Sequence, residues 1–217
     1  MHPLNLQRST QGLLAFTFLC ITLMSVRFVV KDEWRFGFLI WNLFLAWVPF
    51  WLTSIAAQIH ARTGSKLLVI PVLSVWMLFF PNAPYILTDL FHLRFKSSMP
   101  IWFDLVLIMS FAWAGLLYGF LSLWDIERLA RRYVPQTWVS ALSVGLLFLG
   151  SFGVYLGRYL RWNSWDLVSE PYALLYDVSS RIANPTAHPT TWGMTILLGI
   201  FLNMLYWSFR LIRTRAE

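Results

Sequence analysis

The chain has 217 residues, of which 58% are hydrophobic and only 12% are charged, whereas a soluble domain carries about 25% charged residues. Uncharged apolar runs recur along it, and each is long enough to cross a hydrocarbon layer of roughly 30 Å. These values exclude a soluble globular protein. They predict an integral membrane protein built from one membrane domain.

The net charge of +7 would suggest a nucleic-acid partner in a soluble protein. In a membrane protein, basic residues flank the spans as topology signals and contact anionic lipid. No basic helix with interleaved aromatic residues stands clear of the spans, so we expect membrane lipid and no nucleic acid as partner. The single cysteine, Cys20, lies inside the first apolar run, which excludes an intramolecular disulfide.

In chain order, six α-helical spans are predicted at about residues 12–30, 36–58, 67–93, 101–124, 137–160 and 192–212. The link between the last two is long, and residues 172–182 predict an amphipathic helix in the membrane interface. Its apolar face would carry Leu174, Leu175, Val178 and Ile182, and its polar face Asp177, Ser180 and Arg181.

The third span contains the most informative stretch, because Pro81 and Pro84 interrupt it with Asn82 between them. Proline removes a backbone donor and clashes with the preceding turn, so a regular helix should break here. Within a bilayer, broken backbone is tolerated only where protein or a water-filled cavity covers it. We expect residues 80–85 to be non-helical, with Asn82 capping the short helix that follows.

Nearly all chemically capable side chains fall on one side of the predicted membrane, at the ends of spans that share a leaflet. Ionisable groups at that depth are candidates for function. The predicted site residues are Asn42, Asn82, Tyr85, Asp89, His92, Asp104, Tyr155, Arg158, Arg161, Asn163 and Asp166. The opposite side offers only flanking charges. We therefore expect a site that opens to one face.

Asp89 and His92 are three residues apart and share one helical face, as do Arg158 and Arg161. Three interpretations follow, and the first is a purely structural salt-bridge network. The second is an anion site, in which Arg158, Arg161 and Asn163 bind a phosphate or carboxylate while Asp89, Asp104 and His92 act as acid–base groups. The third, a weaker alternative, is a metal site formed by Asp89, His92 and Asp104.

Two pairs of glycines, Gly115 with Gly119 and Gly153 with Gly157, have the small-xxx-small spacing that permits close helix packing. No convincing internal repeat occurs, so the inverted-repeat argument for a secondary transporter finds no support. The sequence identifies no cofactor.

Four strings together resemble a known family: Phe-Phe-Pro-Asn-Ala-Pro-Tyr at 79–85, Trp-Phe-Asp-Leu at 102–105, Ser-Phe-Ala-Trp at 110–113 and Gly-Arg-Tyr-Leu-Arg-Trp-Asn-Ser-Trp-Asp at 157–166. The chain is similar to the bacterial and plant integral-membrane family called domain of unknown function 1361. The resemblance covers residues 41–166 and extends through the last span. It implies a protein with several spans and transfers neither an activity nor catalytic residues.

Three functions remain open. The first is binding or processing of an anionic lipid or lipid-linked head group at the one-sided site. The second is a proton-coupled carrier or channel for a small solute, which would use the broken third span. The third is a membrane assembly or scaffold protein whose charges serve only to hold helices together. A carrier needs a polar route to the other leaflet, where the predicted spans are apolar, and this favours the one-sided site.

Orientation follows from where the basic residues cluster, because nine of the 17 lie on the side of the termini and eight on the other. The first group is concentrated at Arg128, Arg131 and Arg132 and in the tail, so we expect both termini on the cytoplasmic side of the cell membrane. Alkaline phosphatase fused after Arg215 should then be inactive, and the same reporter fused near Ser97 should be active. The reverse pattern would invert the sidedness of the site.

Overall fold

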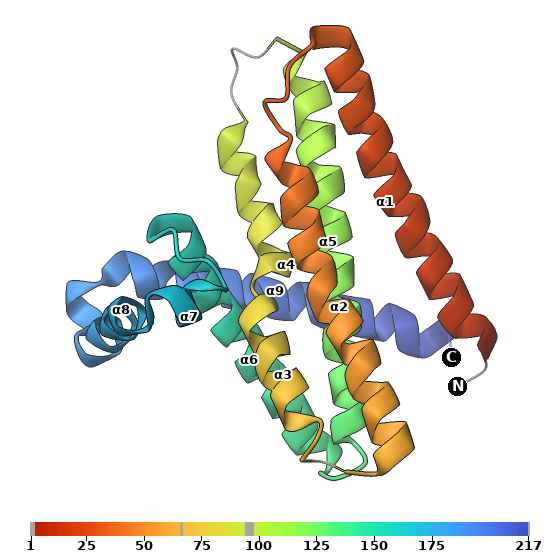
Figure 1. The fold of residues 1–217 in the computed structure, drawn as a ribbon, viewed down its shortest axis with the longest axis vertical. Coiled ribbons are helices and arrows are strands. Elements are labelled where there is room, and N and C mark those ends of the chain that lie inside the picture. The colour runs from red at the N-terminus through yellow and green to blue at the C-terminus, as the bar shows by residue number, and fades with distance from the viewer. Residues whose placement is uncertain (1–2, 66, 94–97, 217) are drawn as a thin grey trace.

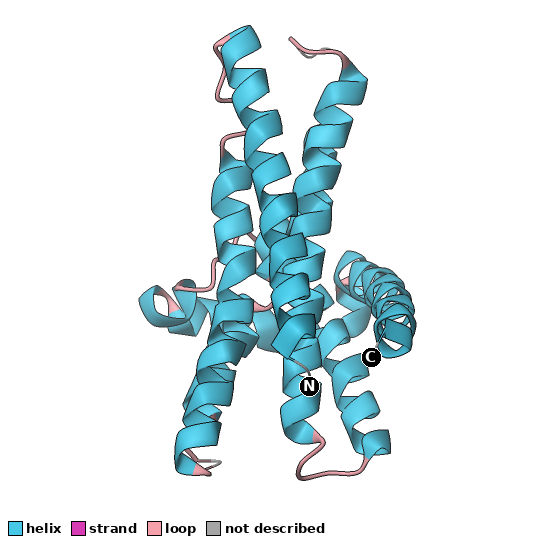
Figure 2. Cartoon of the chain, turned by 90° about the vertical axis from the view of Figure 1, so that its right-hand side faces the viewer, coloured by secondary structure: helices cyan, strands magenta, loops and turns pink. Residues whose placement is uncertain are grey.

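The computed structural model describes residues 3–65, 67–93 and 98–216, and all regular structure within these ranges is helical (Figures 1 and 2). Six helical segments are long and apolar enough to cross a membrane: Thr10–Lys31, Phe38–Thr63, Ile70–His92, Ile101–Ala130, Gln136–Tyr159 and Pro189–Arg213. The six predicted spans are confirmed, and with them the assignment of the chain as a membrane protein. The reporter position at Ser97 lies outside the described ranges.

Five long helices and one segmented span make up the fold. The long helices are α1 (Pro3–Lys31), α2 (Phe38–Thr63), α5 (Ile101–Ala130), α6 (Gln136–Tyr159) and α9 (Pro189–Ala216). The third span consists of α3 (Ile70–Phe79), α4 (Asn82–Tyr85) and the 3₁₀-helix η1 (Ile86–His92). The long fifth connection holds α7 (Asp166–Ser169), α8 (Pro171–Ala183) and η2 (Pro185–Ala187).

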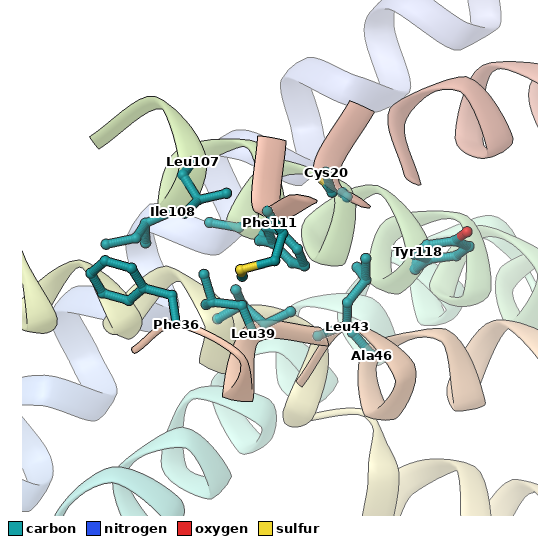
Figure 3. Close-up of a cluster of buried hydrophobic side chains, with 14 of the residues drawn as sticks. Cys20, Phe36, Leu39, Leu43, Ala46, Leu107, Ile108, Phe111 and Tyr118 are labelled. Atoms are coloured by element: carbon teal, nitrogen blue, oxygen red, sulfur yellow. The ribbon is translucent and has the colours of Figure 1, made fainter. Parts of the chain in front are cut away.

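Helix α5 is the centre of the molecule, and it packs against α1, α2, η1 and α4. Its buried residues recur every three or four positions, as in Leu107, Ile108 and Phe111, which is the spacing of one helical face. Figure 3 shows this face in contact with Leu39 and Leu43 of α2, with Cys20 of α1 nearby. The apolar core therefore lies where α1, α2 and α5 meet.

The sixth apolar helix has a different direction from the others. Helices α1, α2, α5 and the third span run roughly along the long axis of the molecule, whereas α9 lies across that axis (Figures 1 and 2). It packs against α6, with Trp192 stacked on Phe152 at a centroid distance of 6.1 Å. Its C-terminal half reaches α5, where Tyr206 contacts Phe120.

The third span is broken at the prolines, but differently from the prediction. Phe80 and Pro81 keep helical dihedral angles, at φ/ψ of −54°/−39° and −60°/−22°, and residues 82–85 form α4. The expectation that residues 80–85 are non-helical is therefore wrong. Proline fixes φ near the helical value, and Pro84 lies in the first turn of α4, where a missing N–H is tolerated. The regular pattern of backbone hydrogen bonds is therefore interrupted at the prolines, while the dihedral angles stay helical.

Asn82 does not cap the following helix as predicted. The residue before α4 is Pro81, which offers no side-chain cap. The Asn82 amide instead donates backwards, from Nδ2 to the carbonyl oxygen of Phe79 at 2.9 Å. An asparagine amide carries both donors and an acceptor, and here the donors meet the carbonyl oxygens that the break has released.

Five glycines on α5 and α6 allow the broken third span to pack closely against these two helices. A Cβ atom built at Gly153 would lie 2.5 Å from Pro81 Cγ, and one at Gly119 would lie 2.7 Å from Ala83 Cβ. At Gly157 the nearest atom would be Tyr85 Cε2, at 3.2 Å. Gly115 and Gly150 face Ile86 and Phe80 in the same way. The predicted close packing is confirmed, and α4 is the element packed so closely.

Replacing Gly153 with alanine should therefore destabilise the protein, because the added methyl group meets the rigid Pro81 ring. Overpacking of this kind costs about 1–3 kcal/mol. Gly145 lies on the same helix with nothing within 4 Å of a built Cβ, so Gly145→Ala should stabilise by about 0.5–1 kcal/mol. Thermal unfolding of both variants in one detergent measures the difference. Equal thermal unfolding midpoints for the two variants would show that Gly153 does not pack closely against Pro81.

Candidate functional site

A cavity of about 450 Å³ lies beside the broken span, between α2, α3, α6 and the α7–α8 segment. Five aromatic residues form part of its wall: Trp41, Tyr85, Phe152, Trp162 and Trp165. Most of the remaining wall is aliphatic: Leu45, Met77, Leu78, Leu149, Leu156, Leu167, Leu174 and Val178, with Pro81, Gly153 and Gly157. Its size and apolar walls are typical of small-molecule sites.

The break in the third span supplies polar groups to this cavity. Ser164 Oγ donates a hydrogen bond to the carbonyl oxygen of Leu78 at 3.0 Å, and the same hydroxyl oxygen accepts one from Asn82 Nδ2 at 3.0 Å. A buried carbonyl without a partner would cost free energy, so Ser164 and Asn82 replace the helical donors. Both side chains line the cavity.

The polar lining is neutral throughout. It consists of Asn42, Ser74, Asn82, Asn163 and Ser164. No aspartate, glutamate, histidine, lysine or arginine occurs among the described residues that line the cavity. Amides and hydroxyls both donate and accept hydrogen bonds, so this set suits a polar group without net charge.

The Asp89 carboxylate does not line the cavity, and both of its oxygens have hydrogen-bond partners within the protein. Its side chain is 1% exposed; Oδ1 accepts from Arg158 Nη2, and Oδ2 accepts from Asn42 Nδ2 at 2.8 Å. Asn42 therefore contacts both the ion pair and the cavity. A carboxylate buried in this way needs a charge partner and further hydrogen bonds, and both are present.

The Arg158 guanidinium likewise has several partners within the protein. Its Nε donates to Thr88 Oγ1 at 2.8 Å, and its guanidinium carbon lies 4.4 Å from the centroid of the Tyr85 ring. The guanidinium thus binds Asp89 and Thr88 while it contacts Tyr85, a residue of the cavity wall. Thr88 in turn donates to the carbonyl oxygen of Tyr85 at 2.6 Å. These contacts hold Tyr85 in place from residues that do not line the cavity.

His92 lies at the edge of this cluster. Its Nδ1 is 3.8 Å from Asp89 Oδ1, its side chain is 44% exposed, and its ring packs on Phe38 at a centroid distance of 4.9 Å. The structure thus brings together Asp89, Arg158, Asn42 and His92, as the one-sided site predicted.

Asp104 does not join them. Its Oδ1 accepts from Arg27 Nε at 2.9 Å, and the Arg27 side chain is fully buried. Arg27 also donates to Ser98 Oγ at 3.4 Å and lies 3.8 Å from Glu33 Oε2. The expected convergence of Asp104 with Arg158 is wrong, because an arginine on α1 provides the nearer partner. The metal alternative required Asp104 beside Asp89 and His92, and no group of three His, Cys, Asp or Glu residues suited to a metal occurs in the described part of the chain.

The other predicted residues occupy the edge of the site. Arg161 is exposed in a left-handed turn at φ 63° and does not line the cavity. Asp166 Oδ2 accepts from the Asn163 backbone N–H at 2.7 Å and so stabilises the turn that brings Asn163 to the cavity. Tyr155 is buried and stacks on Tyr159, away from the lining. The two arginines therefore do not form the expected anion grip.

Helix α8 covers one side of the cavity, and its faces are distributed differently from the prediction. Leu174 and Val178 point to the cavity, while Leu175 and Ile182 are more than half exposed. The charges turn inward: Arg181 is 8% exposed, and its Nη1 donates to Asp177 Oδ1 at 2.9 Å. Trp162 Nε1 donates to the other oxygen of that carboxylate at 2.8 Å. The predicted polar face therefore packs against the protein.

A further buried carboxylate, Glu127 on α5, was missed by the sequence analysis. Its side chain is 1% exposed and lies near Arg131, Arg210 and Ser143. The prediction that the opposite side carries only flanking charges is wrong. A signal was available, because Glu127 follows Phe120 and Leu123 at helical spacing and so falls on the buried face of α5.

A family model described as "Protein of unknown function (DUF1361)" matches residues 41–205 of this chain. The match includes every described residue that lines the cavity, from Trp41 to Val178, and it confirms the resemblance drawn from the sequence strings. No curated protein and no solved structure matches the chain.

Proposed function

The chain belongs to the DUF1361 family, and we propose that this protein binds a membrane amphiphile with an uncharged, hydrogen-bonding head group in the cavity beside α4. The observation that carries the proposal is the lining of that cavity. Its walls are apolar and aromatic, and its polar groups are amides and hydroxyls from four separate segments: Asn42, Ser74, Asn82, and the Asn163–Ser164 turn.

The wall formed by α8 supports an approach from the bilayer. On its outer side, Tyr172, Leu175 and Tyr176 are 87%, 59% and 74% exposed. Such a surface is unfavourable in water and suits the boundary between head groups and acyl chains, where tyrosines gather. Because the inner side of the same helix lines the cavity, an amphiphile needs to pass only this helix to enter from the lipid.

The charge distribution favours a neutral head group. An anionic head group, which the sequence suggested, requires a cation within reach. Arg158 already binds Asp89 and Thr88, and Arg161 lies outside the lining. Withdrawing Arg158 would leave a buried carboxylate unpaired, at a cost of about 3–5 kcal/mol. A head group that pairs with Asn82, Asn163 and Ser164 avoids this cost.

Binding is a better account of the cavity than processing of its occupant. Acid–base catalysis needs a titratable group within hydrogen-bond reach of the substrate. His92, Asp89 and Asp104, the predicted acid–base residues, are all absent from the lining. We therefore propose a carrier, presenter or sensor of the amphiphile, with its cavity in the extracytoplasmic half if both termini are cytoplasmic.

The proton-coupled carrier remains the second proposal, because Glu127 gives the other half of the protein a buried titratable group. A solute route would have to pass Phe120 and Leu123, which are buried on α5 between Glu127 and the glycines that contact the broken span. These side chains form an apolar layer that a transported solute would have to cross. A binding site on one side accounts for the cavity without any route through this layer.

Filling the cavity from α8 tests the binding proposal. Val178→Trp places an indole inside the cavity, whereas Ser179→Trp adds the same group to the exposed neighbouring position. We expect the first variant to lose the amphiphile that co-purifies with the unmodified protein, and the second to keep it. Native mass spectrometry from mild detergent measures the bound mass, and thermal unfolding confirms the fold. A folded Val178→Trp variant with the same bound mass would refute this use of the cavity.

A further inference from the structure

A second charged site lies at the end of α5, remote from the cavity. Glu127 Oε1 accepts from Ser143 Oγ at 2.6 Å and lies 3.4 Å from Arg210 Nη1. The other oxygen, Oε2, accepts from Arg131 Nη2 at 3.0 Å. Residues from α5, α6 and α9 thus meet at one carboxylate that is almost completely buried.

Arginines near the Glu127 carboxylate also contact the faces of aromatic rings. The guanidinium carbons of Arg131 and Arg213 lie 5.3 Å and 5.5 Å from the Trp124 ring. Arg213 also lies 6.0 Å from the Phe209 ring. A contact of this kind with an aromatic face holds a guanidinium group in place. The arginines are therefore positioned before any ligand arrives.

Positive charge exceeds negative charge in this cluster. Arg128, paired with Asp125 at 3.9 Å, is the fourth arginine, so four guanidinium groups meet the two carboxylates Asp125 and Glu127. The side chains of Arg128, Arg131 and Arg210 are 39%, 35% and 22% exposed, so an outside acceptor can reach them.

We propose that this arginine cluster binds the phosphate of an anionic phospholipid head group. Arg210 and Arg213 lie near the C-terminal end of α9, and Arg128 and Arg131 lie at the C-terminal end of α5, so the four arginines gather at the ends of two long apolar helices. Basic pockets between membrane helices bind such head groups, and arginine pairs with phosphate through two parallel hydrogen bonds.

The site is independent of the amphiphile cavity. Glu127 lies eight positions along α5 from Gly119, which contacts Ala83 of α4, and this corresponds to about 12 Å along the helix. The two ligands also differ in chemistry, because the cavity lining is neutral and the cluster carries excess positive charge. Each proposal can fail without the other.

The test measures binding of phosphatidylglycerol, phosphatidylcholine and inorganic phosphate to the purified full-length protein in detergent. We expect phosphatidylglycerol to raise the thermal midpoint, and neither of the others to do so at the same concentration. Arg213→Gln should weaken the apparent affinity for phosphatidylglycerol about fivefold, the factor that corresponds to roughly 1 kcal/mol per basic residue at a membrane surface. Arg161→Gln, an equal change of charge at an exposed position away from the cluster, should leave it unchanged.

Three results would overturn the proposal. An equal response to phosphatidylcholine would show that charge is not recognised. An equal response to inorganic phosphate would assign the cluster to a free anion and exclude the lipid. Equal weakening by Arg161→Gln and Arg213→Gln would reduce the effect to net charge. Arg213→Lys keeps the positive charge but lacks the planar fork that pairs with phosphate, so with an unchanged thermal midpoint in the absence of lipid it should still lose affinity for phosphatidylglycerol.

Discussion

The pairing of buried charge is the constraint on which the rest of this structure depends. An unpaired ion in a low-dielectric interior is costly, and removing one partner of a buried pair typically costs about 3–5 kcal/mol. Three carboxylates here are almost fully buried, and an arginine from a distant part of the chain meets each of them. The pairs are Arg27 of α1 with Asp104 of α5, Arg158 of α6 with Asp89 of η1, and Arg210 of α9 with Glu127 of α5. Each pair joins two spans, so the buried charges add a specific contact between them.

The cavity follows from two features that act together. The glycines of α5 and α6 let the broken span pack closely against them, and at the break Ser164 and Asn82 donate to the carbonyl oxygens of Leu78 and Phe79. Because Asp89 and Arg158 neutralise each other behind Tyr85, the space in front of the break is left apolar with a few neutral polar groups. A membrane protein thereby gains a hydrogen-bonding pocket at a helix break without exposing charge to lipid.

The sequence predicted those features that depend on one segment at a time. Run lengths located the six spans, and Pro81 with Pro84 located the break. The partner of Asp104 could not be predicted, because Arg27 lies 77 residues earlier and helix spacing gives no information over that distance. The Asn82 side chain was assigned as an acceptor, yet an amide also donates, and the carbonyl oxygens released by the break decided between the two. The inward charges of α8 depend on Trp162, which only the folded chain brings to Asp177.

The central claim is that the Asp89–Arg158 pair supports the cavity without touching its ligand, and a paired replacement tests it most directly. Asp89→Leu alone should destabilise the protein, because it leaves Arg158 buried and unpaired. Adding Arg158→Met should restore much of the thermal midpoint, since an apolar pair can replace a buried ion pair. We predict that the double variant, purified in native lipid, keeps its co-purifying amphiphile in native mass spectrometry. A folded double variant that has lost the amphiphile would contradict the account and return Arg158 to the role of a ligand-binding cation.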